Sequence, residues 1–410
     1  MIRNRHFNLL LFVNIVTTLG IELFTVTVLV AVFDETGSTL QTAGTTVARA
    51  LPAFVLGPIA GVLVDRFRRK NVLIGMDLIR LLLIGLAYLF LQGGGKIPVL
   101  AMYVILTGLS AADVFHRPAN IALIPSLVQS DQLVEANSSV MIIRQVMMAL
   151  SYVVGGWLIQ FVPLAQISVW VALMFALGVV AAWLMIVPER SAESDQEAKE
   201  PVFAAFVSGW TYLQQHPIAR PLTIMETIEH LPHGIWTQAL LLAFTIQALQ
   251  GTAVEWGYQA TGYFAGMILG SFASFGMSDW LSRHPGRVIV STAAMAGIMT
   301  FVYAASPSVL FAVIMAFLFG FPFAIRDVAQ DALLQSTVET GQLGRVYATR
   351  EMLRMAVFMF AGLFFAWLSE MMSIRTIYVI GGVIYVLTGV YALSVKAVRE
   401  SKVVTAAPSG

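Results

Sequence analysis

Four polar residues lie on one side of an otherwise apolar segment, residues 7–33. They follow one another at spacings of four, four and three, so an α-helix aligns them in one stripe: Asn14, Thr18, Glu22 and Thr25. Such a stripe predicts a face that borders a water-filled cavity instead of lipid. A carboxylate there can carry a proton, because loss of hydration favours its neutral form. The alternative is that Glu22 is tied to an arginine and holds two helices together.

A second polar stripe lies in the segment 98–124. Its members follow one another at three, three, four and three residues: Thr107, Ser110, Asp113, Arg117 and Asn120. Asp113 and Arg117 are one helical turn apart, so we expect them to pair within the helix. This pair would open when a proton or a cationic substrate competes for Asp113, or it would be a permanent structural pair. His116 is either a packed side chain or a proton relay.

The segment 219–247 carries two further carboxylates, Glu226 and Glu229. They are candidates for binding protons or a substrate, or they are simply hydrated near the membrane surface. His230 and His233 follow at spacings that resemble a metal site, but nothing else in the sequence supports one. We therefore predict no metal and no other cofactor.

Other candidates are a tryptophan and a charged group in the segment 308–334. Trp236 can stack on a ligand or serve in packing. Arg326 and Asp327 lie near the cytoplasmic end, with Asp331 one turn further on. Asp327 is equivalent to Arg117 in the internal repeat described below, so we expect an ion pair between two halves of the chain that closes an inner gate.

A short charged sequence separates two further apolar segments, 44–64 and 71–92. It reads Gly61-Val-Leu-Val-Asp65-Arg66-Phe-Arg68-Arg69-Lys70. Cations at such a junction mark the cytoplasmic side of a membrane. We predict a tight hinge there, braced by Asp77 and Arg80. We also expect Arg144 to join Glu351 and Arg354 in an inner gate network.

The composition requires a membrane protein. Hydrophobic residues make up 58% of the 410 residues and charged residues 11%, against about 25% charged in a soluble domain. The first apolar segment is too long for a signal-peptide core and contains Glu22, so we expect it to be retained. The absence of cysteine excludes disulfides and thiol chemistry, and no phosphate-binding loop is present. The net charge of +1 gives no indication of nucleic-acid binding.

We predict an all-α integral membrane protein with about twelve transmembrane helices, because about 20 apolar residues suffice to cross a bilayer. The apolar segments are 7–33, 44–64, 71–92, 98–124, 137–161, 166–188, 219–247, 257–281, 287–305, 308–334, 347–370 and 374–396. They divide into bundles at 1–188 and 219–396, joined by a cytoplasmic linker with an amphipathic segment at 189–218. We expect the tail, 397–410, to lack regular structure.

The basic residues predict that both termini are cytoplasmic, since Lys and Arg collect on that side. Lys96 and Arg375 fall in segments that this topology places outside. Sixteen of the 24 fall in its cytoplasmic segments: Arg3, Arg5, Arg66, Arg68, Arg69, Lys70, Arg190, Lys199, Arg220, Arg283, Arg287, Arg345, Arg350, Lys396, Arg399 and Lys402.

The two halves repeat. Residues 122–133 align with residues 332–343, with six identities in twelve positions. The same offset places Arg144 on Arg354, and a similar offset near the start of each half places Asp65 on Asp279. Two related six-helix bundles predict a substrate site near the membrane midplane.

The hinge sequence from Gly61 to Lys70 resembles the loop signature of the major facilitator superfamily. Three stretches resemble its group of bacterial drug efflux proteins, which includes macrolide exporters and the enterobactin exporter: 51–80, 118–137 and 203–217. The resemblance implies two pseudo-symmetric bundles, export as the direction of transport, and a cavity lined by spans one, four, seven and ten. The chain departs from the family at Arg68, where the hinge usually has glycine. The antiporter signature of span five survives only as Gly155-Gly156, and the usual early arginine of span four is absent.

These observations predict a proton-coupled secondary transporter that exports lipophilic drugs or similar small molecules. A dedicated exporter of a siderophore or another metabolite is the alternative, with Arg49 and Arg117 as candidates for binding acidic groups. An uncoupled facilitator, a membrane enzyme and a receptor are further alternatives. We expect a monomer in the bacterial inner membrane whose partners are its substrate, protons and the lipid bilayer.

Overall fold

The part of the chain that the structure describes is almost entirely helical. The structure is a computed structural model and describes residues 4–64, 66–92, 98–129, 132–187 and 202–401. No strand occurs in these ranges. Residues 1–199 and residues 200–410 form two compact units, each with its own core.

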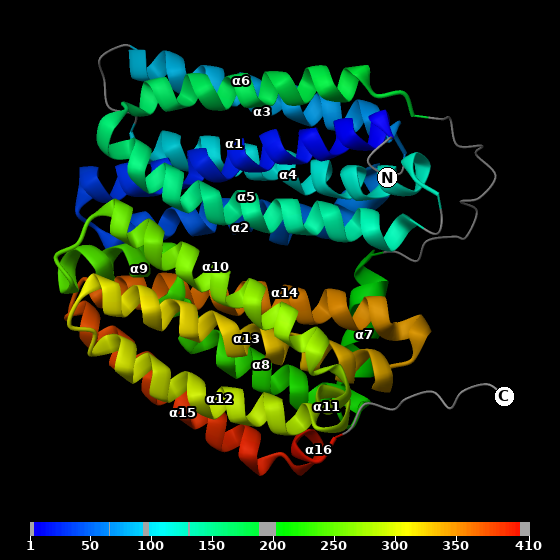
Figure 1. The fold of residues 1–410 in the computed structure, drawn as a ribbon, viewed down its shortest axis with the longest axis vertical. Coiled ribbons are helices and arrows are strands. Elements are labelled where there is room, and N and C mark those ends of the chain that lie inside the picture. The colour runs from blue at the N-terminus through cyan, green and yellow to red at the C-terminus, as the bar shows by residue number, and fades with distance from the viewer. Residues whose placement is uncertain (1–3, 65, 93–97, 130–131, 188–201, 402–410) are drawn as a thin grey trace. The chain divides into compact units, whose positions relative to one another are not determined.

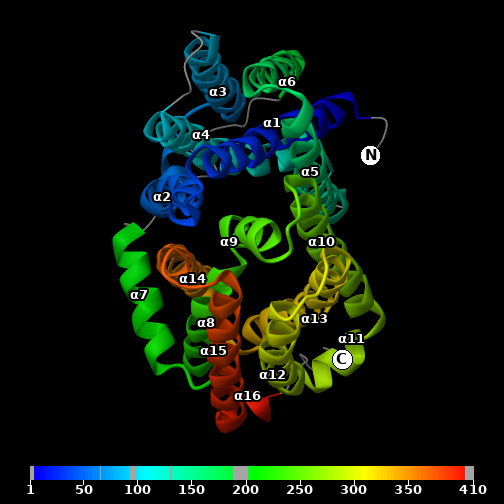
Figure 2. The same ribbon diagram turned by 90° about the vertical axis from the view of Figure 1, so that its left-hand side faces the viewer.

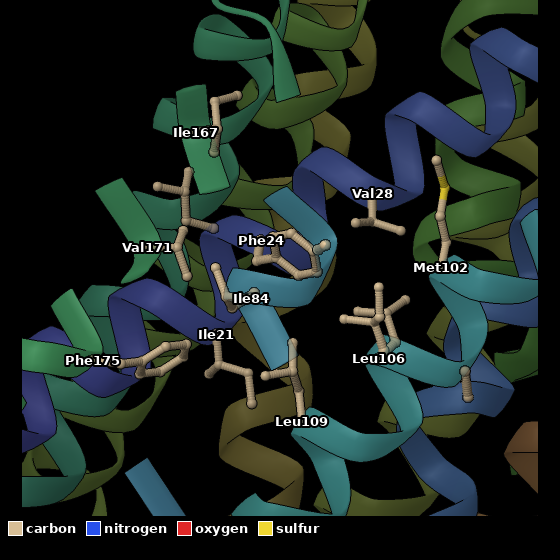
Figure 3. Close-up of a cluster of buried hydrophobic side chains, with 14 of the residues drawn as sticks. Ile21, Phe24, Val28, Ile84, Met102, Leu106, Leu109, Ile167, Val171 and Phe175 are labelled. Atoms are coloured by element: carbon tan, nitrogen blue, oxygen red, sulfur yellow. The ribbon is translucent and has the colours of Figure 1, made fainter. Parts of the chain in front are cut away.

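The first unit is a bundle of long helices that lie side by side (Figure 1). They are α1 (Arg5–Thr36), α2 (Thr39–Val64), α3 (Arg69–Gln92), α4 (Val99–Leu127), α5 (Leu133–Phe161) and α6 (Leu164–Leu184). Helix α1 packs against α5 and α6, α2 packs against α4, and α3 packs against both α4 and α6. Figure 3 shows the apolar side chains that these contacts bury, among them Phe24, Ile84 and Phe175.

The second unit contains more elements. They are α7 (Val202–Gln215), α8 (Ala219–His233), η3 (Gly234–Trp236), α9 (Gln238–Ala243), η4 (Phe244–Ala248), α10 (Ala253–Gly276), α11 (Ser278–Arg283), α12 (Pro285–Ala304), α13 (Val309–Thr337), α14 (Thr340–Ser369), α15 (Ile374–Ser394) and α16 (Lys396–Arg399). Figure 2 shows α7 beside α14, against which it packs.

Within the described residues, nine helices are long and apolar enough to cross a membrane. Helices α2 and α10, with 26 and 24 residues, also exceed the bilayer core of about 30 Å at about 1.5 Å per residue. The series from α8 to η4 supplies one more crossing. These segments coincide with the twelve apolar segments of the sequence.

The span expected at 219–247 is not one continuous helix, which corrects the sequence-based expectation. Helix α8 ends at His233, one turn of 3₁₀-helix follows, and α9 begins after Thr237 in extended geometry. Pro232 lies inside the last turn of α8, where it removes a backbone donor and crowds the preceding turn. Gly234 then brings the chain against the backbone of Ala361 and Gly362 in α14.

The beginning of the C-terminal tail is more ordered than predicted. Residues Lys396–Arg399 form α16, and Val398 is fully buried against the start of α12. A side chain at Gly286 would collide with the carbonyl oxygen of Val398, so the close contact depends on this glycine. The linker boundaries at 189 and 218 stay a prediction.

Helices α10 and α13 approach each other closely through glycine. Gly262, Gly266 and Gly270 are spaced by four residues on α10, and each lies against the backbone of α13. A Cβ atom at Gly266 would lie 2.1 Å from the carbonyl oxygen of Phe317. Small residues at this spacing allow membrane helices to pack backbone to backbone.

We predict that Gly266→Ala lowers the free energy of unfolding by about 1–3 kcal/mol, because a backbone carbonyl cannot move aside as a side chain can. Equilibrium unfolding of the purified protein in detergent measures this. Gly85→Ala on α3 is the matched control, since no atom lies within 4 Å of its new Cβ position. Equal effects of the two substitutions would contradict the close α10–α13 contact.

Candidate functional site

A cavity of about 290 Å³ opens in the first unit. Residues of α1, α4 and α5 line it, and its polar lining includes most residues of the two predicted stripes. The polar and charged lining residues are Asn14, Thr17, Thr18, Glu22, Asp113, His116, Arg117, Asn120, Asn137 and Arg144. The helical periodicity therefore places the polar faces of α1 and α4 on one cavity.

Glu22 lies in this cavity wall and forms a bidentate ion pair with Arg49 of α2. The two carboxylate oxygens accept hydrogen bonds from the guanidinium at 2.7 and 2.9 Å. The hydroxyl of Ser110 on α4 donates to the carbonyl oxygen of Arg49 at 2.6 Å. Glu22 thus has the arginine partner of the structural alternative and also a place on the cavity. A charge-paired carboxylate beside a cavity can still exchange its partner for a ligand.

The ion-pair partner that the structure gives Asp113 lies on a different helix. Arg80 of α3 donates to Asp113 at 2.7 Å and to Asp77 at 2.8 Å. His116 places Nε2 3.4 Å from the same Asp77 oxygen. We call Asp77, Arg80, Asp113 and His116 the Arg80 cluster.

Several other polar residues of the first cavity bind one another or the backbone. The amide of Asn14 donates to the side-chain oxygen of Asn120 at 3.1 Å, joining α1 to α4. Thr18 lies in the cavity wall, whereas Thr25 donates to the carbonyl oxygen of Ile21. The cavity face of α1 therefore extends from Asn14 to Glu22.

The second unit contains a larger network of charged residues. Glu226 on α8 forms an ion pair with Arg350 on α14, and Glu229 forms one with Arg326 on α13. Arg326 also donates to Asp327 at 3.0 Å. Two cavities of about 200 and 190 Å³ adjoin this network, and Glu226, Asp327, Gln330 and Arg354 line both.

The histidines and Trp236 have partners inside the second unit. His230 Nδ1 lies 2.7 Å from the carbonyl oxygen of Glu226, and His233 Nδ1 lies 2.9 Å from the hydroxyl of Tyr385. Trp236 packs against Phe319, with ring centroids 4.5 Å apart, and against Tyr303. Within the described residues, no group of three His, Asp or Glu side chains is placed to hold a metal.

The predicted hinge and gate residues are described in part. Asp65 lies outside the described residues, and Gly61 is described only by its place in α2. Arg66 is exposed, while Arg69 donates to the carbonyl oxygen of Ala122 on α4 at 2.9 Å. Asp279 is exposed in α11.

Four further hinge and gate residues are described by their own surroundings. Asp77 and Arg80 are fully buried in the Arg80 cluster, well inside α3. Arg144 lines the first cavity, and Arg354 pairs with Glu351 on the exposed side of α14. The bracing and gating roles of these residues stay predictions.

Two arginines at the sites had not been assigned these partners from the sequence. Arg49 was considered for acidic substrates, and Arg350 was counted among the cytoplasmic cations. Both lie inside helices, and Arg350 is buried. The available signal is that each lies within, or at the edge of, a predicted span, where a cation needs a carboxylate partner.

Comparison with known proteins identifies the class. The sequence signature of the Major Facilitator Superfamily matches residues 10–252, more than half of the chain. The uncharacterized MFS-type transporter YfmI of Bacillus subtilis (strain 168) is 24% identical over 386 residues, covering 94% of this chain and 95% of that protein. Macrolide efflux protein A of Streptococcus pyogenes is 25% identical over 326 residues, covering 77% of each chain.

Solved structures show the same fold. A bacterial homolog of the human lysosomal transporter Spinster, in an inward-facing conformation, matches with a TM-score of 0.68 and 15% identity over 97% of both chains. A bacterial homologue of the iron transporter ferroportin matches with a TM-score of 0.70 and 14% identity, over 95% of this chain and 98% of that one.

The chain belongs to the Major Facilitator Superfamily. It is a multi-pass membrane transporter of small molecules and not an enzyme. The predicted all-α fold of this superfamily and the predicted resemblance to its drug efflux group are confirmed.

We predict that Arg350→Met lowers the free energy of unfolding by about 3–5 kcal/mol, because it leaves the carboxylate of Glu226 buried without its cation. The double variant Glu226→Gln/Arg350→Met regains most of this loss. Equilibrium unfolding in mixed detergent micelles measures both values.

Arg354→Met is the control for this prediction. Its partner Glu351 and Arg354 itself have about half of their side-chain surface exposed, at 52% and 49%. We expect a change of about 0–1 kcal/mol there. If Arg350→Met lowers the free energy of unfolding by no more than Arg354→Met does, the pair of Glu226 and Arg350 is hydrated.

Proposed function

We propose that the protein is a proton-coupled secondary transporter that exports lipophilic, often cationic, drugs or similar small molecules by alternating access. The observation that carries this proposal is the first cavity, where Glu22 and Asp113 each lie in the wall and each pair with an arginine. The similarity to macrolide efflux proteins supports a drug as the exported molecule.

The two ion pairs with arginine allow a substrate and a proton to replace one another at the same carboxylates. Glu22 pairs with Arg49 and Asp113 pairs with Arg80, so each carboxylate has a cation beside it before a substrate binds. A cationic substrate that reaches one of these carboxylates competes with the arginine. A proton that binds there has the same effect. Because protons and cations compete for the same groups, binding of one favours release of the other.

The cavity size is suited to part of a drug-sized molecule. A volume of about 290 Å³ is at the lower end of small-molecule sites, which span about 300–1,000 Å³. Apolar residues such as Ile21, Ile124 and Met141 complete its lining. An apolar wall with a few charged groups favours lipophilic ions, because such ions lose little hydration on entry.

An exporter of a siderophore or another acidic metabolite is the second candidate. Arg117 and Arg144 also lie in the wall of the first cavity and favour anionic groups. Arg49, considered for the same role, is engaged by Glu22 in this structure. An uncoupled facilitator needs the cavity but does not need protons and substrate to compete for the same carboxylates.

The distribution of basic residues supports a bacterial inner-membrane location with both termini in the cytoplasm. The charge pairs support a monomer as the working form, because each of them joins helices of the same unit. The second unit contributes Glu226, Glu229 and Asp327 as further candidates for binding protons or substrate.

We predict that a lipophilic cation such as tetraphenylphosphonium, or a macrolide such as erythromycin, moves protons across the membrane of proteoliposomes that contain the wild-type protein. An enclosed pH dye reports this movement, and radiolabelled compound reports transport. Asp113→Asn and Glu22→Gln should each reduce the proton movement at least ten-fold, because each removes an exchangeable carboxylate.

Glu400→Gln, in an exposed position beyond the bundle, is the matched control and should leave the flux unchanged. Transport of labelled compound without proton movement would identify an uncoupled facilitator. Proton movement triggered only by a catecholate siderophore would favour the metabolite exporter. Full activity in both carboxylate variants would rule out the first cavity as the exchange site.

A further inference from the structure

The Arg80 cluster contains one more negative charge than positive charge. Two carboxylates, Asp77 and Asp113, share the single guanidinium of Arg80. Asp77 has no exposed side-chain surface and Arg80 has 1%, so water does not reach Asp77, whereas Asp113 is 32% exposed at the cavity. Buried carboxylates in such surroundings are matched by a cation or take up a proton.

His116, whose ring can accept a proton, lies beside Asp77, where the cluster lacks a positive charge. Nε2 of His116 lies 3.4 Å from Oδ1 of Asp77, and the histidine side chain is 5% exposed. Among the described residues, neither Nε2 of His116 nor Oδ2 of Asp77 has a hydrogen-bond partner. An imidazolium form of His116, protonated on both ring nitrogens, would donate a hydrogen bond from Nε2 to Asp77 and would bring the cluster to neutrality.

Among the described residues, the parts of α1 and α6 that pack around Asp77 bring no charged side chain next to it. Helix α6 places Gly178 next to Oδ2 of Asp77, at 3.2 Å from a Cβ built there, and places Phe175 over Arg80. Helix α1 contributes Thr17, whose hydroxyl donates to the backbone of its own helix. The side of the cluster that faces α6 is therefore apolar and close-packed.

Further charged groups lie on the cavity side, next to Asp113. Arg144 of α5 and Arg49 of α2 act on Asp113 through their charges, and Arg117 follows His116 on α4. Arg49 is already balanced by Glu22, and Arg144 and Arg117 line the cavity. These cations are placed to attract anions in the cavity, whereas His116 is placed to neutralise Asp77.

We propose that the Arg80 cluster is a proton-binding site, in which His116 carries one exchangeable proton on Nε2, facing the carboxylate of Asp77. This inference rests on the proposed transport function and names the site of its coupling proton. It places that site on α3 and α4, at and behind the cavity wall, and leaves Glu22 as a carboxylate that a cationic substrate can bind.

Arg80 connects the proton to the substrate. Asp113 has 32% of its side chain exposed and lines the cavity, whereas Asp77 is closed off. A cation that binds Asp113 replaces Arg80 as the positive charge that neutralises this carboxylate. Arg80 then neutralises Asp77 alone, so the positive charge on His116 is no longer needed. His116 releases its proton through the cavity, which it also borders. Return of the proton draws Arg80 back to Asp113 and expels the cation.

The test is the protonation state of His116 in the purified full-length protein at pH 7. Histidine labelled with ¹⁵N in the ring distinguishes imidazolium from neutral imidazole by nuclear magnetic resonance, and loss of a signal in His116→Gln assigns it. We expect imidazolium in the wild type. We expect neutral imidazole in Asp77→Asn and in Asp113→Asn, because either substitution leaves one carboxylate for Arg80.

Glu22→Gln is the matched control, since Glu22 belongs to the separate pair with Arg49 and its removal should leave His116 as imidazolium. Using two asparagine variants keeps the test decisive if one of them fails to fold, as judged by size-exclusion chromatography. A neutral His116 in the wild type overturns the proposal. Imidazolium that persists in the asparagine variants also overturns it.

This measurement needs no substrate, so its outcome is separate from that of the transport assay. A neutral His116 in a protein that moves protons with its substrate would leave the proposed function intact and place the proton elsewhere. An imidazolium that responds to Asp77→Asn and Asp113→Asn in a protein without substrate-driven proton flux would establish the proton site and contradict the coupled transport.

Discussion

The structure depends on one constraint, which is that a charge in the hydrocarbon region needs an opposite charge within its own unit. Each charge at a helix centre costs about 2.5–3.5 kcal/mol on insertion scales, and pairing removes much of this penalty. In the first unit the pairs join α1 to α2 and α3 to α4; in the second they join α8 to α13 and to α14. The same contacts hold the helices in register and place carboxylates beside the cavities. A structural role for Glu22 does not exclude the proposed functional one, because its pair with Arg49 joins two helices and also lies beside the cavity.

The helices and the polar faces could be predicted from the sequence because both are local properties. Apolar length sets where the spans lie, and spacing sets which residues share a face, as for Asn14, Thr18 and Glu22. The partners could not be predicted, since pairing depends on which helices pack together. Local spacing assigned Asp113 to Arg117, whereas the structure pairs it with Arg80, 33 residues earlier in the chain. Arg80 reaches Asp113 because α3 packs directly against α4, and the sequence alone does not reveal this contact.

The repeat relates the two units, but their chemistry has diverged. Glu22 aligns with Trp236, so a charged cavity residue in the first unit corresponds to an aromatic side chain packed on Phe319 and Tyr303 in the second. The carboxylates of the second unit come instead from α8, about two and three turns earlier, where Glu226 and Glu229 meet Arg350 and Arg326. Ancestral symmetry thus preserves the arrangement of helices better than it preserves the positions of charge.

The interruption between α8 and α9 affects how the second unit can deform. Bending a continuous membrane helix breaks backbone hydrogen bonds in a medium that cannot replace them. Between Gly234 and Thr237 the regular pattern is already interrupted, and α9 begins without a side-chain cap. Polar atoms of Trp236, Thr237 and Gln238 are also buried without hydrogen-bond partners among the described residues. A change of angle between α8 and α9 therefore breaks few backbone hydrogen bonds. It also lets the buried polar atoms of Trp236, Thr237 and Gln238 form new hydrogen bonds. Span seven, from α8 to η4, is therefore the part of its bundle that bends most easily, because Pro232 and Gly234 interrupt its helix.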